Sequence, residues 1–114
     1  MPNLRMNSTI QQQTNNSGSG YCKFLDGTLI QWGSGNIGVE TESAVFNINF
    51  PIPFSGNPTG FICPAASTSD RNNFFIFACY NEETTKMTAK GWRLGGTIQP
   101  ANPAYRWQAI GRWK

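Results

Sequence analysis

The sequence predicts an all-β protein, a small antiparallel β-sandwich of about six to seven short strands. Charged residues make up only 13% of the 114 residues, while aromatic residues also reach 13% and glycine occurs 12 times. This composition is typical of a β-rich domain. No window of helical length repeats apolar residues at the spacing of an amphipathic helix. Apolar and polar residues instead alternate in short segments, which turn signals separate at intervals of roughly 10 to 15 residues.

Residues 1–19 contain mainly Asn, Gln, Ser and Thr, with few apolar residues among them. Such a segment cannot bury enough apolar surface by itself to offset the conformational entropy that is lost on folding. We therefore divide the chain into a polar leader, residues 1–19, and one domain of ordinary size, residues 20–114.

The domain begins with a predicted β-hairpin over residues 21–33. Asp26-Gly27 is the signal of a two-residue type I′ turn, which needs positive φ at both central positions. Trp32 closes the second strand and is predicted to pack in the core. The glycine-rich residues 33–38 are predicted to form a loop.

Five further strands are predicted, over residues 44–50, the segment TGFICPAAS up to Pro64, residues 73–80, residues 86–94 and residues 105–113. In residues 44–50, Phe46, Ile48 and Phe50 face one way, and Val45, Asn47 and Asn49 face the other. In residues 105–113, one face is predicted to carry Tyr105, Trp107, Ala109 and Trp113, and the opposite face Arg106, Gln108 and Arg112. Residues 73–80 are apolar on both faces, which predicts a central strand covered on both sides. The predicted core consists of Phe24, Trp32, Phe46, Ile48, Phe50, Phe61, Phe75, Phe77, Met87, Trp107 and Ala109.

The residues available for chemistry favour a binding protein. Histidine is absent, which removes Ser-His-Asp and Cys-His catalysis and nearly all catalytic zinc sites. The three cysteines have no C-x-x-C spacing, which argues against structural zinc and favours three buried thiols in a reduced compartment. We therefore predict no enzymatic activity, no metal and no cofactor. A glycosidase pair formed by carboxylates from different loops is the alternative that sequence spacing leaves open.

The formal net charge is +3, from nine Lys and Arg residues against six Asp and Glu. These cations are scattered along the chain instead of forming a basic run, which argues against nucleic-acid binding. No apolar run approaches the roughly 18 residues of a membrane span, so membrane insertion is not expected. A mildly positive surface suits an anionic cell-surface glycan.

Three segments in order, GYCKFLDGTLIQWG, VFNINFPIPFSGNPTGF and YRWQAIGRWK, resemble the C-terminal domains of tailed-phage tail fibre proteins. The resemblance extends over residues 20–114. The middle and final segments are also similar to H-type lectins, which are trimeric six-stranded sandwiches that bind galactosamine-like sugars. The lectins' sugar-contacting arginine aligns with Phe74, and their Trp-His pair aligns near Leu94-Gly95. The second resemblance therefore implies the scaffold and not that sugar specificity.

The resemblance implies a homotrimer of H-type-lectin-like β-sandwiches, in which residues 1–19 are the end of a fibre shaft. Val45, Phe74, Ile76 and Ala78 are apolar on faces that do not all belong to one core. Side chains of this kind indicate burial between subunits.

The function implied is that of a receptor-binding tip domain in the tail fibre of a phage or a phage-derived bacteriocin. Its expected partner is a bacterial surface glycan such as lipopolysaccharide, with a fibre assembly chaperone as a further candidate partner. Such a protein is made in the host cytoplasm and lies at the distal end of the fibre in the virion. The alternatives are a structural trimerisation cap of a fibre and a polysaccharide-degrading tail protein.

Candidate receptor-binding residues combine hydrogen-bonding or stacking chemistry with a place in a loop or on an exposed strand face. They are Asp70, Arg71, Asn72, Asn73, Trp92, Arg93, Tyr105 and Arg106. Trp92 shares a strand face with Lys86 and Lys90 by alternation. It is therefore either an exposed stacking platform or part of a trimer interface.

Strand counting predicts which loops share an end of the sandwich. If the chain enters the domain at residue 20, the loops at residues 34–43, 67–72 and 95–104 lie at the shaft end. The hairpin turn and the C-terminus then lie at the far end. A lectin-like pocket belongs to the first set of loops, so it competes with direct contact by the tip.

Overall fold

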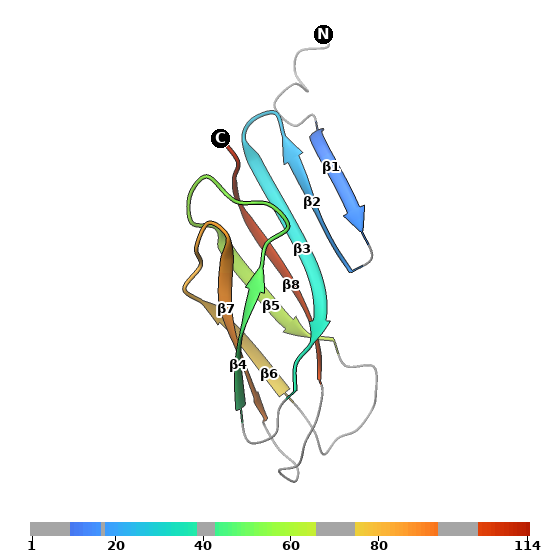
Figure 1. The fold of residues 1–114 in the computed structure, drawn as a ribbon, viewed down its shortest axis with the longest axis vertical. Coiled ribbons are helices and arrows are strands. Elements are labelled where there is room, and N and C mark those ends of the chain that lie inside the picture. The colour runs from blue at the N-terminus through green and yellow to red at the C-terminus, as the bar shows by residue number, and fades with distance from the viewer. Residues whose placement is uncertain (1–9, 17, 39–42, 66–74, 94–102) are drawn as a thin grey trace.

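The computed structural model describes residues 10–16, 18–38, 43–65, 75–93 and 103–114. All regular secondary structure in these residues is β, and the strands form two antiparallel sheets that pack face to face (Figure 1). The all-β sandwich predicted from alternation and turn signals is therefore confirmed, with eight strands instead of the six to seven expected.

The strands are β1 (Ile10–Asn16), β2 (Ser19–Phe24), β3 (Thr28–Asn36), β4 (Ser43–Asn49), β5 (Thr59–Pro64), β6 (Phe75–Tyr80), β7 (Lys86–Arg93) and β8 (Ala104–Arg112). The larger sheet has five strands in the order β1-β2-β3-β8-β5, and the smaller sheet has three in the order β4-β7-β6. Figure 1 shows the smaller sheet across one face of the larger sheet, with β1 and β2 to one side. Each sheet therefore has an inner face and an outer face.

The strand that composition did not predict is β1, which lies within the proposed polar leader. It pairs antiparallel with β2, so that Ile10 lies opposite Phe24 and Gln13 opposite Cys22. Backbone pairing, which no side-chain pattern reports, holds this mainly polar segment in place. The chain thus reaches the sandwich at the end that carries the β2–β3 turn. The assumption behind the strand counting, that the chain enters the sandwich at residue 20, is therefore wrong. The prediction that the hairpin turn and the C-terminus share one end is confirmed, because the Trp113 N–H donates to the Gly27 carbonyl.

Three residues, not two, connect β2 to β3. The Gly27 N–H donates to the Phe24 carbonyl at 3.0 Å, and Gly27 is the turn residue with positive φ, at 101°. This geometry is that of a type I turn followed by a left-handed glycine, so the type I′ turn predicted for Asp26-Gly27 is wrong. Asp26 accepts a hydrogen bond from the Thr28 N–H at 2.8 Å, and this bond lowers the pKa of its carboxyl group.

β3 continues through the glycine-rich segment that was predicted to be a loop. It pairs with β8 along its whole length, with Gly33 opposite Trp107 and Gly35 opposite Tyr105. A Cβ atom at Gly35 would lie 2.7 Å from the Tyr105 hydroxyl oxygen. These glycines are therefore strand positions across which the aromatic rings of β8 lie.

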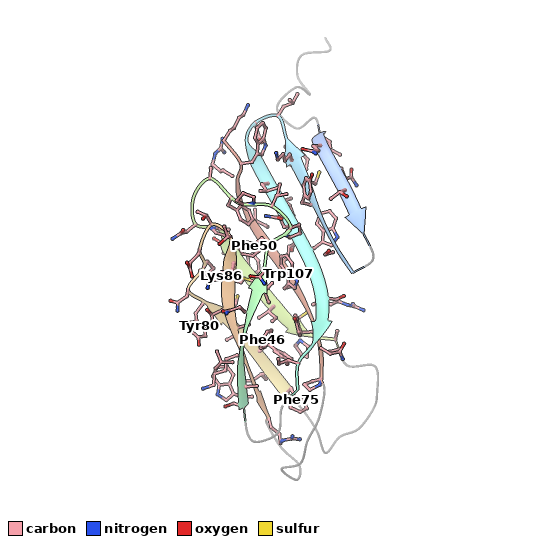
Figure 2. The ribbon with its side chains drawn as sticks, viewed as in Figure 1. Phe46, Phe50, Phe75, Tyr80, Lys86 and Trp107 are labelled. Atoms are coloured by element: carbon pink, nitrogen blue, oxygen red, sulfur yellow. The ribbon has the colours of Figure 1, made fainter. Side chains whose placement is uncertain are left out.

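The core lies between the two sheets and consists of Leu29, Ile48, Phe50, Phe54, Met87, Ala89, Trp107 and Ala109. Figure 2 shows Phe46, Phe50 and Trp107 gathered there, and the ring centroids of Phe50 and Trp107 are 5.7 Å apart. The predicted alternation of residues 44–50 is confirmed, because Ile48 and Phe50 are buried while Asn47 is exposed.

Two predicted core residues lie instead on the outer face of the larger sheet. Phe61 is 52% exposed, and its neighbour Ile62 packs against the core in its place. Trp32 follows the buried Gln31, and its ring leans over Gly20 on β2. In a short, largely apolar strand, alternation does not show which of the two sets of side chains faces inward. For Phe61, the pairing of β5 with β8 decides the face.

Gln31 is a fully buried polar residue on the inner face of β3. Its side-chain Nε2 donates to the Ile52 carbonyl at 2.8 Å, and its Oε1 accepts from the Ile52 N–H at 3.0 Å. Both backbone groups of Ile52 are thereby satisfied, as they would be in a strand pair. These two bonds fasten residues 50–54 to the larger sheet.

β6 is an edge strand, although its apolar sequence predicts a central one. The central strand of the smaller sheet is β7. Phe75, Phe77 and Cys79 alternate with the more exposed positions of β6, where Ile76 is 43% and Tyr80 is 41% exposed. Among the described residues, only one of the two apolar faces of β6 is therefore covered.

Candidate glycan-binding site

A hollow of about 170 Å³ lies on the outer face of the larger sheet, and we call it the β5–β8 hollow. It is lined by Phe61, Ile62, Cys63, Arg106, Trp107 and Gln108. β5 is the last strand of this sheet, and β6 of the smaller sheet runs close beside it. Because Arg112, at the other end of β8, pairs with Thr28 beside the β2–β3 turn, the hollow lies in the half of the sandwich remote from that turn.

The register between β5 and β8 decides which side chains meet in the hollow. Phe61 lies opposite Gln108, and Cys63 lies opposite Arg106. Directly opposed residues of an antiparallel pair project to the same face, so these four side chains share the outer face. Ile62 lies between Phe61 and Cys63 in the sequence and packs against the core from the other side.

Three side chains give the β5–β8 hollow the chemistry of a sugar-binding site. The half-exposed Phe61 ring offers an apolar face on which a pyranose ring can stack. Gln108 is exposed, and its amide can both donate to and accept from a hydroxyl group. Arg106 is also exposed and adds a fixed fork of N–H donors. An aromatic face beside such groups matches the apolar and polar sides of a sugar.

The charge of the hollow is positive. Arg106 is the charged residue of its lining, and no carboxylate belongs to that lining. In the described part of the chain, Asp26 lies in the β2–β3 turn, and Glu82 and Glu83 lie in the β6–β7 connection. The Glu82 side chain lies beside Gly60, on the inner side of β5. The larger sheet therefore separates it from the hollow.

The structure separates the receptor-binding residues predicted from the sequence. Arg106 lines the hollow, whereas Trp92 lies on the outer face of the smaller sheet, where the Lys90 Nζ is 4.9 Å from its ring centroid. Tyr105 projects between the sheets, and its ring centroid is 4.9 Å from that of Phe46. Burial raises the pKa of the Tyr105 hydroxyl group.

Arg93 lies at the end of β7, and its guanidinium carbon is 4.9 Å from the Phe75 ring centroid. Asp70, Arg71, Asn72 and Asn73 lie outside the described residues. The predicted residues that are described do not form one site. Sequence reasoning missed Phe61, which it assigned to the core. The alternation of residues 105–113 did place Gln108 beside Arg106, but nothing in the sequence showed that β5 pairs with this strand.

The outer face of the smaller sheet is a second exposed surface, which we call the three-stranded outer face. Its apolar residues are Val45, Ile76, Ala78, Tyr80 and Trp92. Val45 is 57% exposed, and Figure 2 shows Tyr80 pointing away from the interior. The prediction that Val45, Ile76 and Ala78 lie outside the core is confirmed, and Phe74 falls outside the described residues. These side chains form a surface that the described chain leaves uncovered.

The three cysteines are free thiols in different environments. Cys63 is exposed, so the prediction of three buried thiols is wrong for this residue. Burial, and to a lesser extent the Glu82 carboxylate, raises the pKa of the partly buried Cys79. Among the described residues, no group of three or more His, Cys, Asp or Glu side chains is placed to hold a metal ion. That part of the chain also contains no apolar helix of membrane-spanning length.

The two-sheet arrangement is the fold of tail fibre C-terminal domains. A structure of the R2 pyocin fibre of P. aeruginosa matches with a TM-score of 0.64 at 21% sequence identity, over 89% of this chain and 25% of that one. An N-truncated R1-type pyocin tail fibre matches with a TM-score of 0.67 at 20% identity, over 88% of this chain and 84% of that one. At such identities the likeness shows the fold alone. The chain spans a quarter of the R2 structure.

The sequence itself shows the family. Residues 23–112 match the C-terminal domain of the putative gp53-like tail fibre proteins, and the chain belongs to that family. No match to a curated protein was found. The tail fibre resemblance predicted from the three sequence segments is therefore confirmed, and the family makes the protein a tail fibre component. The likeness to H-type lectins stays a prediction.

Proposed function

We propose that this tail fibre domain binds a bacterial surface glycan, such as lipopolysaccharide, in the β5–β8 hollow. It would thus be the receptor-binding domain of a phage or phage-derived bacteriocin fibre. The exposed Phe61 ring beside Gln108 and Arg106 on the outer face of the larger sheet carries the proposal. An aromatic face flanked by hydrogen-bonding side chains can contact the apolar and the polar side of one ligand together. Stacking and a few solvated hydrogen bonds give weak affinity at a single site.

We further propose a homotrimer whose subunits meet through the three-stranded outer face. Val45 and Ile76 are large apolar side chains on this face, and because each is already about half buried, burial of the rest would contribute roughly 1 kcal/mol for each. Three copies of a weak glycan site on one fibre would multiply its affinity through avidity. In this arrangement Trp92 belongs to the trimer interface, the second of the two roles predicted for it.

The path of the chain supports a distal position for the hollow. Ile10 lies beside Phe24, and the Trp113 N–H donates to the Gly27 carbonyl at 2.9 Å, so β1 begins at the end where β8 finishes. Figure 1 shows the start of β1 and the C-terminus at this end of the sandwich. A shaft that precedes β1 would join there, with the hollow in the opposite half. Synthesis in the host cytoplasm and an assembly chaperone as partner stay predictions.

We propose binding without turnover of the glycan. Glycoside hydrolysis needs two carboxyl groups roughly 5–10 Å apart on either side of the scissile bond. The lining of the β5–β8 hollow contains no carboxylate in the described part of the chain. The hollow can therefore hold a sugar but has no acid or nucleophile of this kind to cleave it.

The test is a glycan and lipopolysaccharide binding screen on the purified chain, with its mass in solution measured on the same sample. We expect three times the chain mass of 12.6 kDa and binding to a bacterial surface glycan. Phe61→Ala and Gln108→Ala should reduce binding and leave the mass unchanged. Val45→Glu should lower the mass. Gln12→Ala, at an exposed position of β1, is the matched control for Gln108→Ala and should behave as the parent.

Other outcomes would contradict the proposal in identifiable ways. A trimer that binds no bacterial glycan would favour a protein receptor or a structural trimerisation cap. Release of free oligosaccharide from a bound polysaccharide would show catalysis. Loss of trimers in Phe61→Ala would instead place the hollow inside the subunit interface.

A further inference from the structure

We propose that the sugar held in the β5–β8 hollow carries a negative charge, as a carboxylate or a phosphate group, and that Arg106 binds this group. The inference rests on the proposed function, because it names the chemical class of glycan that the same hollow takes.

The first argument is the charge of the hollow. Arg106 lies between Ser34 on β3 and Cys63 on β5, and both of these neighbours are neutral side chains. Among the residues that the structure describes, the lining of the hollow supplies no carboxylate to balance the guanidinium group. The hollow therefore presents one uncompensated positive charge, which complements an anionic ligand.

The second argument is the size of the hollow and the spacing within it. Its volume of about 170 Å³ is smaller than the roughly 300–1,000 Å³ of a site that encloses a whole small molecule. Phe61 and Arg106 lie in adjacent outward-facing rows, which are about 7 Å apart along the strands. This spacing suits one sugar ring stacked on Phe61 with its charged substituent directed toward Arg106.

The third argument is the donor geometry of arginine. A guanidinium group offers parallel N–H donors that match two oxygens of a carboxylate or a phosphate. A neutral sugar hydroxyl can use only one of these donors. We expect the charged sugar to bind about tenfold more tightly than the neutral one at low salt. The difference is this modest because Arg106 is exposed to solvent, where a hydrogen bond to a charged group is only somewhat stronger than one to a neutral group. The preference should weaken as salt screens the charge.

The experiment compares matched sugars that differ in charge, using the full chain labelled with ¹⁵N. The pairs are galacturonic acid with galactose, and glucose 6-phosphate with glucose. We expect the charged member of one or both pairs to shift the amide signals of Phe61 and Gln108 at lower concentration. The two pairs tell a carboxylate ligand from a phosphate ligand. Arg106→Gln should abolish the difference within a pair, and Lys86→Gln, a matched loss of charge on the other sheet, should retain it.

A second measurement reports the charge of the hollow without a sugar. Cys63 is an exposed thiol opposite Arg106, so it can be alkylated with anionic iodoacetate or with neutral iodoacetamide. A change in the thiolate fraction of Cys63 changes the alkylation rates of both reagents by the same factor. The ratio of the iodoacetate rate to the iodoacetamide rate therefore reports only how strongly the hollow attracts the anionic reagent. We expect this ratio to fall several-fold in Arg106→Gln and to stay at the parent value in Lys86→Gln.

Two results would overturn the inference. One is equal binding of the charged and neutral sugars, and the other is an alkylation ratio at Cys63 that Arg106→Gln does not change. If Phe61→Ala then abolishes binding of a neutral surface glycan, the charged class is wrong while glycan binding stands. If no glycan binds and the alkylation ratio still depends on Arg106, the proposed function fails although the hollow attracts anions.

Discussion

Replacement of Gln31 by methionine tests how the sandwich holds the segment that follows β4. Methionine has a similar length and shape but cannot form the two hydrogen bonds that link the Gln31 amide to the Ile52 N–H and carbonyl. A backbone polar group left without a partner on burial costs about 1–3 kcal/mol. Since Ile52 is only partly buried, the lower half of that range applies to each of its two groups.

The expected loss in the free energy of unfolding is therefore about 2–4 kcal/mol before the gain from burying an apolar side chain. Full burial of a methionine in place of the amide returns about 1 kcal/mol, which leaves a net loss of about 1–3 kcal/mol. For a domain of this size, such a loss lowers Tm by roughly 5–10 °C. Urea and thermal unfolding at a fixed protein concentration measure it, because subunit association makes Tm depend on concentration.

Two further variants test whether the loss of stability comes from the two hydrogen bonds between Gln31 and Ile52. Gln12→Met changes the same residue type at an exposed position of β1 and should cost less than about 0.5 kcal/mol. Gln31→Glu can form both bonds to Ile52 only when its carboxyl group is protonated. Burial raises the pKa of that carboxyl group above its unfolded value of about 4.3. The Gln31→Glu variant is therefore most stable below about pH 4, and it loses this stability as the pH rises through the pKa of the group in the folded state. A Gln31→Met variant as stable as Gln12→Met would refute the reasoning.

Two other predictions concern backbone contacts and thiols. Gly35→Ala places a Cβ 2.7 Å from the Tyr105 hydroxyl oxygen, so it should cost at least about 1 kcal/mol in urea unfolding. Gly38→Ala meets no atom within 4 Å and should stay within about 0.5 kcal/mol of the parent; equal effects of the two variants would count against the close contact. Cys63 should react first with a thiol reagent near pH 8. Cys79, whose raised pKa delays formation of the thiolate, should react only as the pH rises further. Similar labelling rates at the two thiols, followed by mass spectrometry of peptides, would contradict that order.

The sequence was most informative where alternation was strict and chemically clear. Along β8, exposed Arg106 and Gln108 alternate with the buried Trp107 and Ala109, as predicted. Lys90 and Trp92 share the outer face of β7, also as predicted. In such strands one face is polar, so the pattern itself says which side chains reach solvent.

Sequence reasoning failed where the pattern was ambiguous or where backbone pairing was decisive. The segment around Phe61 is apolar at successive positions, and its phase depends on pairing with β8. Gly33 and Gly35 resemble loop residues until the rings of β8 are placed across them. β1 is polar, and its pairing with β2 leaves no mark on composition.

The candidate site shows the same division. Arg106 was identified as a binding residue because an arginine beside an aromatic residue near a loop is chemically suited to a glycan. Its partners could not be identified, because Phe61 and Gln108 are 47 positions apart in the numbering and meet only when β5 joins the edge of the larger sheet. Trp92 and Tyr105, which the sequence grouped with Arg106, lie on other surfaces of the two sheets.

The sequence by itself determined the all-β class, the sandwich and the tail fibre family, because composition, alternation and local motifs are properties of neighbouring residues. The tertiary structure alone decided which apolar faces stay exposed, at which end the chain enters, and which side chains line the hollow. Each of these depends on the register between strands that are distant in the chain. A shift of one residue in such a register reverses the face of every side chain in the strand.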